Sequence, residues 1–205
     1  MKAKFITLEG IEGSGKSTAI RVLSDYLKSK SIEHVITREP GGTAIGEQIR
    51  GLLLDPGNEK MVAETELLLM FAARAQHLFE TIKPALASSK WVLCDRFTDA
   101  TYAYQGGGRQ QEISSIATLE KLVQGALRPD LVLVLDVDPQ LGMQRVDGRG
   151  NRDRFEHEKL RFFEAVREVY LQRAQQDISR YAVIDACLSI DDVNAQIRAA
   201  IERLL

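Results

Sequence analysis

A phosphate-binding motif lies near the amino terminus of the chain. Residues 10–17 read GIEGSGKS and match the pattern G-x-x-x-x-G-K-[ST] at every fixed position. The apolar run at 5–8 precedes the motif as a predicted strand, and helical spacing begins at Ser17. In such a loop several backbone N–H groups point inward above the positive end of the helix, which suits a polyphosphate anion. We therefore expect the loop to bind a nucleoside triphosphate through Gly10, Glu12, Gly13, Ser14, Gly15, Lys16, Ser17 and Thr18.

Two side chains of this loop have chemistry of their own. Lys16 is expected to bridge the β- and γ-phosphates, and the Ser17 hydroxyl to ligate Mg²⁺. Gly13 and Gly15 permit backbone angles and a close approach that a Cβ would obstruct. A chance glycine-rich turn is the alternative, and the strand and helix on either side argue against it.

A second pair of polar residues, Asp95 and Arg96, follows the apolar run at 91–94. A carboxylate at the carboxyl end of a parallel strand lies in the crevice where open α/β sheets bind ligands. Asp95 would hold Mg²⁺ there, directly or through water, and Arg96 would grip a second phosphate with its planar guanidinium. Asp136 also ends an apolar strand and competes for the metal role. A surface salt bridge is the structural alternative for the pair.

The polar stretch at 147–154 contains glycines and is rich in arginine. Phosphoryl transfer spreads negative charge over phosphate oxygens, and an arginine brought onto them stabilises that charge. With Gly148 and Gly150 as hinges, a mobile segment would bring an arginine there and exclude water. We interpret 146–156 as a lid, with a solvated charged loop as the alternative. The arginines in or beside it are Arg145, Arg149, Arg152 and Arg154.

Two further segments have the composition of ligand contacts. Phe71 (or Met70) and Arg74 share one face of a predicted helix, so a ring and a hydrogen-bond donor would meet a base together. Core packing is the alternative for this stripe. Residues 37–43, TREPGGT, are predicted to form a turn after the second predicted strand. The turn lies at the carboxyl end of that strand, where a ligand would bind, and a turn with only a structural role is the alternative.

The elements that position these residues alternate between strands and helices, which predicts βαβ units and a parallel sheet. The run LVLVL at 131–135 is apolar throughout, as in a strand buried on both faces. Strands are predicted at 5–9, 33–37, 91–95, 131–136 and 181–185. Helices are predicted from residue 17 and at 43–54, 59–79, after Pro84, and at 112–124, 139–146, 156–176 and 190–204.

Composition limits the classes of protein that fit. A chain of 205 residues predicts one domain over 1–205, and a net charge of −2 gives no overall nucleic-acid signature. Its two cysteines suggest neither a disulfide framework nor a metal cluster, and Cys94 is predicted to be a buried core residue of a strand. The start runs directly into the first strand without a signal peptide, and no apolar stretch approaches the roughly 20 residues that span a bilayer. We expect a cytoplasmic protein with neither nucleic-acid nor membrane partners. His34, His77 and His157 show no carboxylate partner in the sequence and are predicted at the surface or partly buried.

Taken together and in order, these segments resemble the bacterial thymidylate kinase family over essentially the whole chain. The resemblance rests on Glu9 with the phosphate loop, TREPGGT at 37–43, FAAR at 71–74, DRF at 95–97 and YAYQGGGR at 102–109. It implies transfer of the ATP γ-phosphoryl group to dTMP with Mg²⁺, giving dTDP and ADP. It also implies the P-loop nucleoside-monophosphate kinase fold, with three layers, a five-stranded parallel sheet in the order 2-3-1-4-5, helices on both faces and an arginine-rich lid. A homodimer is implied too, built partly from the apolar-rich helix at 64–79.

The resemblance further implies roles for individual residues. Lys16, Asp95 and Arg149 would be catalytic, and Arg145 would lie on adenine. Glu12 would meet the 3′-hydroxyl of the dTMP sugar, Tyr104 would pack under that sugar, and Arg74 would donate to the thymine carbonyl. The dTMP phosphate would be gripped by Arg96, with Arg50 as a second. Phe71 would stack on the base, or Met70 after a one-residue slip, and the remaining dTMP contacts would come from Glu39, Thr101 and Gln105.

Members of this family differ in where the catalytic arginine lies. Some carry a basic residue directly after the acidic residue of the phosphate loop, where this chain has Gly13. The chain therefore resembles the subtype with lid arginines, in which Arg149 is the closest match and Arg152 has no matched role. Another nucleotide or deoxynucleoside kinase shares this chemistry and differs in its base pocket. A GTPase-like switch would need an Asn-Lys-x-Asp motif, which the chain lacks.

Overall fold

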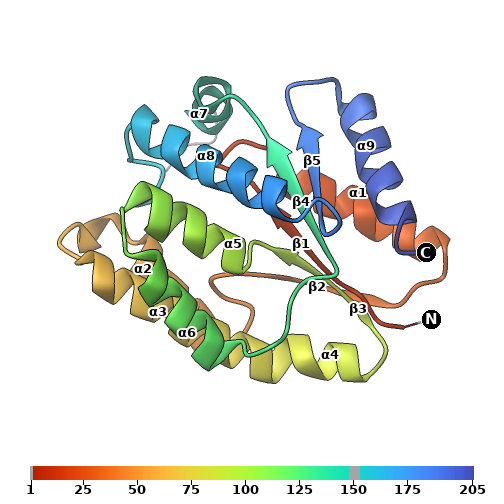
Figure 1. Cartoon of the computed structure of the whole chain (residues 1–205), viewed down its shortest axis with the longest axis horizontal. Coiled ribbons are helices and arrows are strands. Elements are labelled where there is room, and N and C mark those ends of the chain that lie inside the picture. The colour runs from red at the N-terminus through yellow and green to blue at the C-terminus, as the bar shows by residue number, and fades with distance from the viewer. Residues whose placement is uncertain (1, 148–152) are drawn as a thin grey trace.

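The computed structural model describes residues 2–147 and 153–205, and its centre is a parallel sheet of five strands (Figure 1). The strand order is β2-β3-β1-β4-β5, so the predicted fold class and sheet order are confirmed. The second strand begins one residue later than predicted, at His34. The strands are β1 Phe5–Glu9, β2 His34–Arg38, β3 Trp91–Asp95, β4 Leu131–Asp136 and β5 Tyr181–Asp185.

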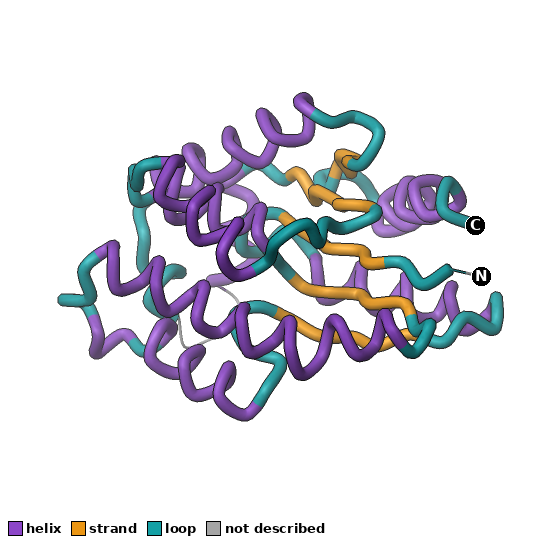
Figure 2. The backbone as a smooth tube through the Cα atoms, turned by 60° about the horizontal axis from the view of Figure 1, so that its bottom comes forward, coloured by secondary structure: helices purple, strands orange, loops and turns teal. Residues whose placement is uncertain are grey.

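Helices cover both faces of this sheet, and Figure 2 shows the strands between helical layers. Helix α1 packs beside α9, α2 beside α3, and α3 beside α6. The helices are α1 Lys16–Ser29, α2 Ala44–Leu54, α3 Ala63–His77, α4 Lys83–Ala87, α5 Thr98–Thr101, α6 Ile113–Val123, α7 Pro139–Asp147, α8 Leu160–Gln176 and α9 Ile190–Glu202.

The long predicted helix at 59–79 differs from the observed one at both ends. A short 3₁₀ turn at Pro56–Asn58 precedes it, and α3 begins only at Ala63. At its far end α3 continues through a π-helical segment, Leu78–Ile82, into α4 without a break at Pro84. Pro84 has no N–H to donate to the turn before it, and that turn is where the π-helical segment lies. The predicted helix at 156–176 likewise starts later, at Leu160.

A helical segment that the sequence did not predict lies directly after β3. The short helix α5 continues as a π-helical segment, Tyr102–Gly108, which packs against α8. Three successive glycines end it, and a Cβ built on Gly108 would come within 2.3 Å of the Phe162 ring. Glycine at this position therefore allows the segment to approach α8 closely enough to bring its polar residues to the edge of the sheet.

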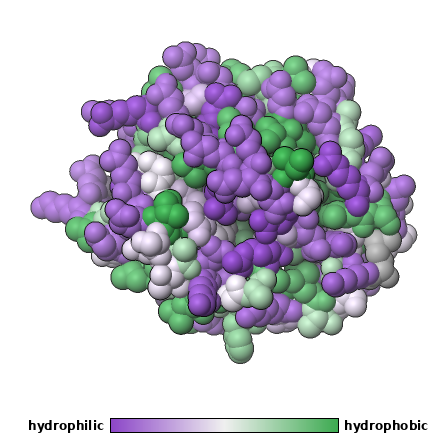
Figure 3. All heavy atoms as spheres, in the orientation of Figure 1, coloured by the Kyte–Doolittle hydropathy of each residue, from purple (hydrophilic) through white to green (hydrophobic). Residues whose placement is uncertain are grey.

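The core is formed mainly by the central strands. Every residue of β1 is buried, and Leu131–Leu135 of β4 are at most 2% exposed, as predicted for a strand covered on both faces. Each fully buried leucine contributes about 1.5–3 kcal/mol. The face of the molecule in Figure 3 is mainly hydrophilic, with scattered apolar side chains. In the part of the chain that the structure describes, no helix is both long and apolar enough to cross a bilayer.

Parallel pairing brings three loops to one edge of the sheet. Leu8 near the end of β1 pairs with Asp95 of β3, and Asp95 pairs with Arg38 of β2. The segments that follow β1, β2 and β3 are the phosphate loop, the turn at 39–43 and the pair Asp95–Arg96. They therefore meet at the carboxyl ends of the strands, where sheets of this kind bind ligands.

Candidate active site

A cavity opens at this edge of the sheet. Its floor is the phosphate loop and the start of α1, and its walls come from the ends of β2 and β3, from α2 and α3, and from the helical segment after β3. The lining residues are Glu12, Gly13, Gly15, Lys16, Ser17, Thr18, Arg38, Glu39, Pro40, Arg50, Leu54, Met70, Arg74, Asp95, Arg96, Phe97, Ala100, Thr101, Tyr104, Gln105, Asp153, Phe155 and Glu156. Of the predicted site residues in the described part of the chain, only Gly10, Ser14, Phe71 and Arg145 do not line it.

The phosphate loop wraps around the ammonium of Lys16. Lys16 Nζ donates hydrogen bonds to the carbonyl oxygens of Gly10 (2.9 Å) and Ile11 (2.8 Å) and to Ser14 Oγ (3.2 Å). Gly10 and Ser14 therefore frame the site without facing the cavity. Burial lowers the pKa of Lys16 to about 8, although the nearby carboxylates of Asp95 and Glu12 oppose that shift. A polyphosphate in the loop would favour the charged ammonium further.

Asp95 has the features expected of a cation ligand. Its Oδ1 is buried and has no hydrogen-bond partner among the described residues, and Ser17 lines the same cavity. The rival carboxylate Asp136 is occupied, because Arg167 donates two hydrogen bonds to it over 2.6 and 2.8 Å. Mg²⁺ commonly takes one or two protein oxygens and completes its shell with water and phosphate. Ser17 and Asp95 fit that requirement, and no group of three or more metal-binding side chains occurs in the described ranges.

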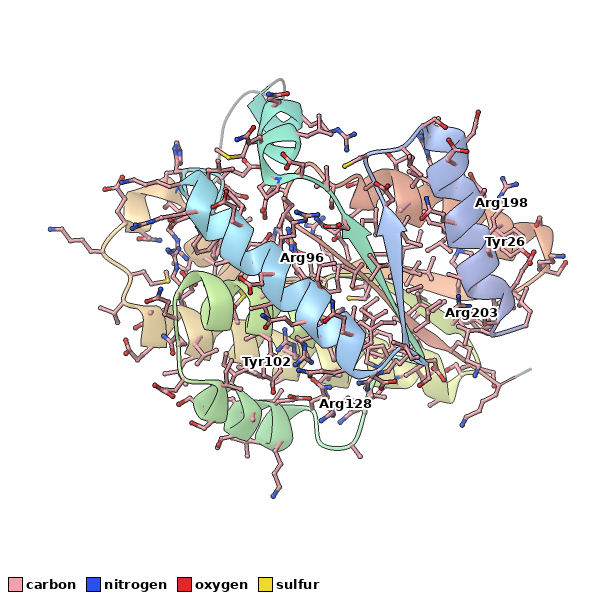
Figure 4. All side chains as sticks on the ribbon, turned by 45° about the horizontal axis from the view of Figure 1, so that its top comes forward. Tyr26, Arg96, Tyr102, Arg128, Arg198 and Arg203 are labelled. Atoms are coloured by element: carbon pink, nitrogen blue, oxygen red, sulfur yellow. The ribbon has the colours of Figure 1, made fainter. Side chains whose placement is uncertain are left out.

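Arg96 joins three parts of the site. Its Nη2 donates to Glu12 Oε1 (2.8 Å) and its Nη1 donates to the Gly10 carbonyl (2.9 Å), while the guanidinium lies 4.7 Å from the centre of the Tyr104 ring. The Tyr104 hydroxyl in turn donates to Glu12 Oε2 (2.6 Å). Figure 4 shows Arg96 beside helix α8, where Nη1 also meets the Tyr170 hydroxyl (3.2 Å).

The backbone of Arg96 is strained. Its φ of +69° lies in the left-handed region, which costs a non-glycine residue about 1–3 kcal/mol. Such strain persists where the surrounding structure fixes it, and it is common in ligand-binding segments. The network around Glu12 is therefore a pre-arranged part of the cavity wall.

Arg74 presents an unpaired donor. Its Nε donates to Glu39 Oε2 (2.7 Å), and its Nη2 donates to the Phe97 carbonyl (3.1 Å) and to Thr101 Oγ1 (3.0 Å). Its Nη1 is buried and has no partner in the described structure. Arg74 lines the cavity, and Nη1 is the donor of its guanidinium that the described residues leave unused.

The prediction for His77 was wrong. His77 is fully buried, and its Nδ1 lies 2.9 Å from Glu39 Oε1, with Thr37 Oγ1 at 2.5 Å from Nε2. Glu39 thus holds His77 on one oxygen and Arg74 on the other. No local pattern indicates this contact, because the two partners of His77 lie about forty positions before it.

The structure corrects the placement of Phe71. Phe71 is 2% exposed, packs with Leu67, Tyr102 and Ile116, and lies beneath the Arg74 guanidinium at 4.8 Å. Met70, one residue earlier, lines the cavity instead. The rotation of α3 therefore turns the Met70 thioether toward the cavity and places the Phe71 ring beneath Arg74. Of the two residues considered in the sequence for contact with a base, Met70 is the one that lines the cavity.

Of the four arginines associated with the lid, two lie within the described residues at its ends. Arg154 is buried, donating through Nε to the Leu53 carbonyl (2.8 Å) and through Nη2 to Glu66 Oε2 (2.6 Å), so it is not free to reach a phosphate. Arg145 donates to the carbonyls of Gly13 (3.3 Å) and Ala186 (3.2 Å), beside the phosphate loop. Arg149 and Arg152 lie outside the described residues.

The last residues of the predicted lid contribute three side chains to the cavity lining, none of which the sequence analysis had singled out. Asp153 Oδ1 accepts hydrogen bonds from the N–H groups of Phe155 (2.9 Å) and Glu156 (3.0 Å), and Glu156 Oε2 accepts from the Asp153 N–H (3.0 Å). This reciprocal arrangement has the pattern of a capping box, although it closes a turn and no helix begins there, and its D-x-x-E spacing was present in the sequence. Phe155 then packs edge-on against Tyr104.

Comparison with known proteins agrees with this geometry. Residues 8–197 match the family model described as thymidylate kinase. A thymidylate kinase of Ectopseudomonas mendocina is 57% identical over 100% of this chain and 98% of its own, and one of Pseudomonas putida strain GB-1 is 55% identical over 99% of each. The crystal structure of thymidylate kinase from Ehrlichia chaffeensis superposes with a TM-score of 0.80 at 34% identity, covering both chains fully. The chain belongs to the thymidylate kinase family.

Proposed function

We propose that this protein transfers the γ-phosphoryl group of ATP to dTMP, giving ADP and dTDP. The observation that carries the proposal is Arg74, whose buried Nη1 has no partner among the described residues, at a cavity that also contains a complete phosphate loop and a second arginine, Arg96. The family membership of the whole chain supports the same activity. A phosphate loop alone would fit many nucleotide-binding proteins, whereas a base-reading donor next to a second phosphate grip suits a nucleotide acceptor.

The chain's residues contribute to the reaction mainly by positioning and by neutralising charge. ATP would lie on the phosphate loop, with Lys16 against its β- and γ-phosphates and Arg145 near adenine. Arg96 and Arg50, both in the cavity wall, would hold the dTMP phosphate in line for attack. Mg²⁺, held through Ser17 and Asp95, would neutralise charge on the ATP phosphates.

The acceptor base would be read by groups already fixed by their neighbours. Arg74 Nη1 would donate to thymine O4, and Thr101 and Gln105 would make the other polar contacts. Met70 would lie against the ring, in the role first predicted for Phe71. Glu12 would meet the sugar 3′-hydroxyl, with Tyr104 beneath the sugar and Glu39 holding Arg74 in place.

We further propose that residues 1–205 act as one kinase domain with a lid at 146–156, and that Arg149 stabilises the transferring phosphoryl group. Arg149 is the closest match to the family's lid arginine, and Arg154 has other partners. A homodimer is part of the same proposal. One face of α3 and the segment after it carries an exposed apolar stripe, Leu68, Ala72, Ala75 and Phe79, and Leu68 and Phe79 are 57% and 76% exposed.

The test is ADP formation from ATP and Mg²⁺ with a panel of nucleosides and nucleoside monophosphates. We expect turnover with dTMP at least tenfold above that with dCMP or dGMP. Lys16→Ala should lower turnover by several orders of magnitude while dTMP still binds, because the ammonium acts on the ATP phosphates. A strong preference for a nucleoside, or for another monophosphate, would assign the chain to a different kinase activity.

A further inference from the structure

A buried carboxylate behind the base pocket, Glu66 on α3, has no role in the function proposed above. Glu66 is 1% exposed and does not line the cavity that contains the phosphate loop. It accepts hydrogen bonds from Gln105 Nε2 (2.8 Å), Arg109 Nε (3.3 Å) and Arg154 Nη2 (2.6 Å). One carboxylate thus connects a residue of the cavity wall with two arginines.

The contact with Gln105 determines which end of its amide faces outward. A carboxylate only accepts hydrogen bonds, so it attracts the Gln105 NH₂ group and repels the carbonyl oxygen. In the described structure no donor hydrogen-bonds Gln105 Oε1, although the residue is almost fully buried and lines the cavity. Oε1 is therefore the atom of Gln105 that remains to accept a hydrogen bond from a ligand.

Arg74 and Gln105 then offer a donor and an acceptor in neighbouring positions. Thr101, which accepts from Arg74 Nη2, precedes Gln105 by one helical turn. The edge of thymine presents the O4 acceptor next to the N3–H donor, which complements this pair. Cytosine presents the reverse order, an amino donor next to an unprotonated N3, so both contacts would be lost. Reversing the Gln105 amide would remove half of this discrimination.

We propose that Glu66 is a positioning residue for base selectivity: it fixes the Gln105 amide so that its carbonyl oxygen faces the substrate base and selects a pyrimidine that carries a hydrogen at N3. The two arginines hold the carboxylate in place, since Arg109 also bonds Glu158 (2.5 Å) and Arg154 also bonds the Leu53 carbonyl. This inference rests on the proposed function, because it concerns dTMP recognition in the same cavity.

The decisive variant is Glu66→Gln, because an amide can either donate or accept and no longer imposes one orientation on Gln105. We expect the ratio of kcat/KM for dTMP over dCMP to fall by about tenfold, the effect of one misplaced hydrogen bond to a buried partner. Glu120→Gln is the matched control. Like Glu66, Glu120 is a buried glutamate that bonds an arginine, Arg128, and its second partner is the Tyr102 hydroxyl. It lies outside the cavity wall. The ratio of kcat/KM for dTMP over dCMP in Glu120→Gln should equal that of the wild type.

A double-mutant cycle tests whether Glu66 acts through Gln105. In the Gln105→Ala background, Glu66→Gln should cause no further loss of selectivity. If Glu66→Gln does not fold, Glu66→Asp keeps the charge beside both arginines and withdraws it from Gln105, and it should lower the ratio with little change in melting temperature. Two results would overturn the inference. One is an unchanged preference for dTMP over dCMP in a folded Glu66 variant, and the other is an equal loss of that preference in the wild-type and Gln105→Ala backgrounds. Wild-type protein that does not prefer dTMP would overturn the proposed function itself, and the inference with it.

Discussion

Arg74 Nε and Glu39 Oε2 lie 2.7 Å apart in a buried ion pair that orients the whole guanidinium group. Glu39 is held in turn by His77, and the Arg74 plane rests between the rings of Phe71 and Phe97, at 4.8 and 5.1 Å. These contacts use Nε, and no described residue pairs with Nη1. A buried donor without a partner costs about 1–3 kcal/mol, so the site is built to regain that energy when a base binds.

Replacing this arginine by lysine tests the base-reading role. Arg74→Lys keeps a charge near Glu39, but the three donors of an ammonium lie on one nitrogen and cannot reach the separate positions that the planar guanidinium spans. We expect kcat/KM for dTMP to fall about 10- to 100-fold, and the preference over dCMP to shrink with it. Steady-state assays with both nucleotides provide the measurement.

Arg128→Lys serves as the control for that exchange. Arg128 also pairs with a glutamate, Glu120 (2.6 Å), but it lies apart from Arg96 in Figure 4 and does not line the cavity. Its substitution should leave both kinetic constants for dTMP unchanged. Equal losses in the two variants would show that Arg74 supports the fold and does not read the base.

The sequence predicted most of the fold because its signals are local. The phosphate loop, the apolar strands and the Thr43 cap of α2, whose hydroxyl accepts from the Gly46 N–H (3.0 Å), each depend on residues close together in the chain. The π-helical segment at Tyr102–Gly108 could not be predicted in this way, because close packing on α8 decides it.

The parts of the site that escaped prediction depend on contacts between distant residues. The rotation of α3 against α6 decides whether Met70 or Phe71 reaches the cavity. A rotation of the helix by one residue would exchange these two side chains. The pairing of His77 with Glu39 and of Arg154 with Glu66 joins segments 38 and 88 positions apart. No spacing rule in a single sequence contains that information.

The stability of the protein should depend on pH through Glu9. Burial, reinforced by the charge of Asp99, raises the pKa of Glu9 from 4.5 to about 8. Between these values the folded chain keeps a proton that the unfolded chain has released. The free energy of unfolding therefore falls as pH rises through this window, by at most about 1.4 kcal/mol per pH unit.

Glu9→Gln isolates this contribution, because the amide can still bond the Phe97 N–H and the Tyr170 hydroxyl. Urea unfolding from pH 5 to 7.5 should show the variant gaining stability relative to the wild type as pH increases. The measurements stay below pH 8 so that the titration of Lys16 does not contribute. Because its pKa is lowered from 10.5 to about 8, Lys16 makes the free energy of unfolding rise with pH only between those two values. Parallel stability curves for the two proteins would contradict the prediction.

Oligomeric state can be tested at the exposed stripe of α3. Leu68→Glu places a charge among the exposed apolar side chains of that face, so burial of the face in a dimer would leave the charge unpaired. We expect sedimentation at micromolar concentration to show a dimer for the wild type and a 22.9 kDa species for the variant. Ile178→Glu, at a residue 79% exposed between α8 and β5, should remain a dimer. A wild type that sediments as a monomer would refute the proposal.

The roles of the two arginines at the lid are separable by kinetics. Gly13 leaves the phosphate loop without a basic side chain of its own at that position, so the charge that develops on the transferring group must be met from another segment. An interaction made mainly in the transition state affects kcat more than KM. Arg149→Ala should therefore lower kcat by about 10³ or more, within the range of arginine fingers, and change KM for dTMP little.

Arg145 is the internal comparison, because its expected partner is the face of adenine, a contact made already in the ground state. The described structure holds its guanidinium beside the phosphate loop, on the Gly13 carbonyl (3.3 Å). Arg145→Ala should raise KM for ATP and leave kcat within about a few-fold of the wild type. If instead Arg149→Ala altered only KM, the catalytic charge would have to come from Arg152, because Arg154 is already bonded to Glu66 and to Leu53. Arg152→Ala would then show the loss of kcat expected here for Arg149.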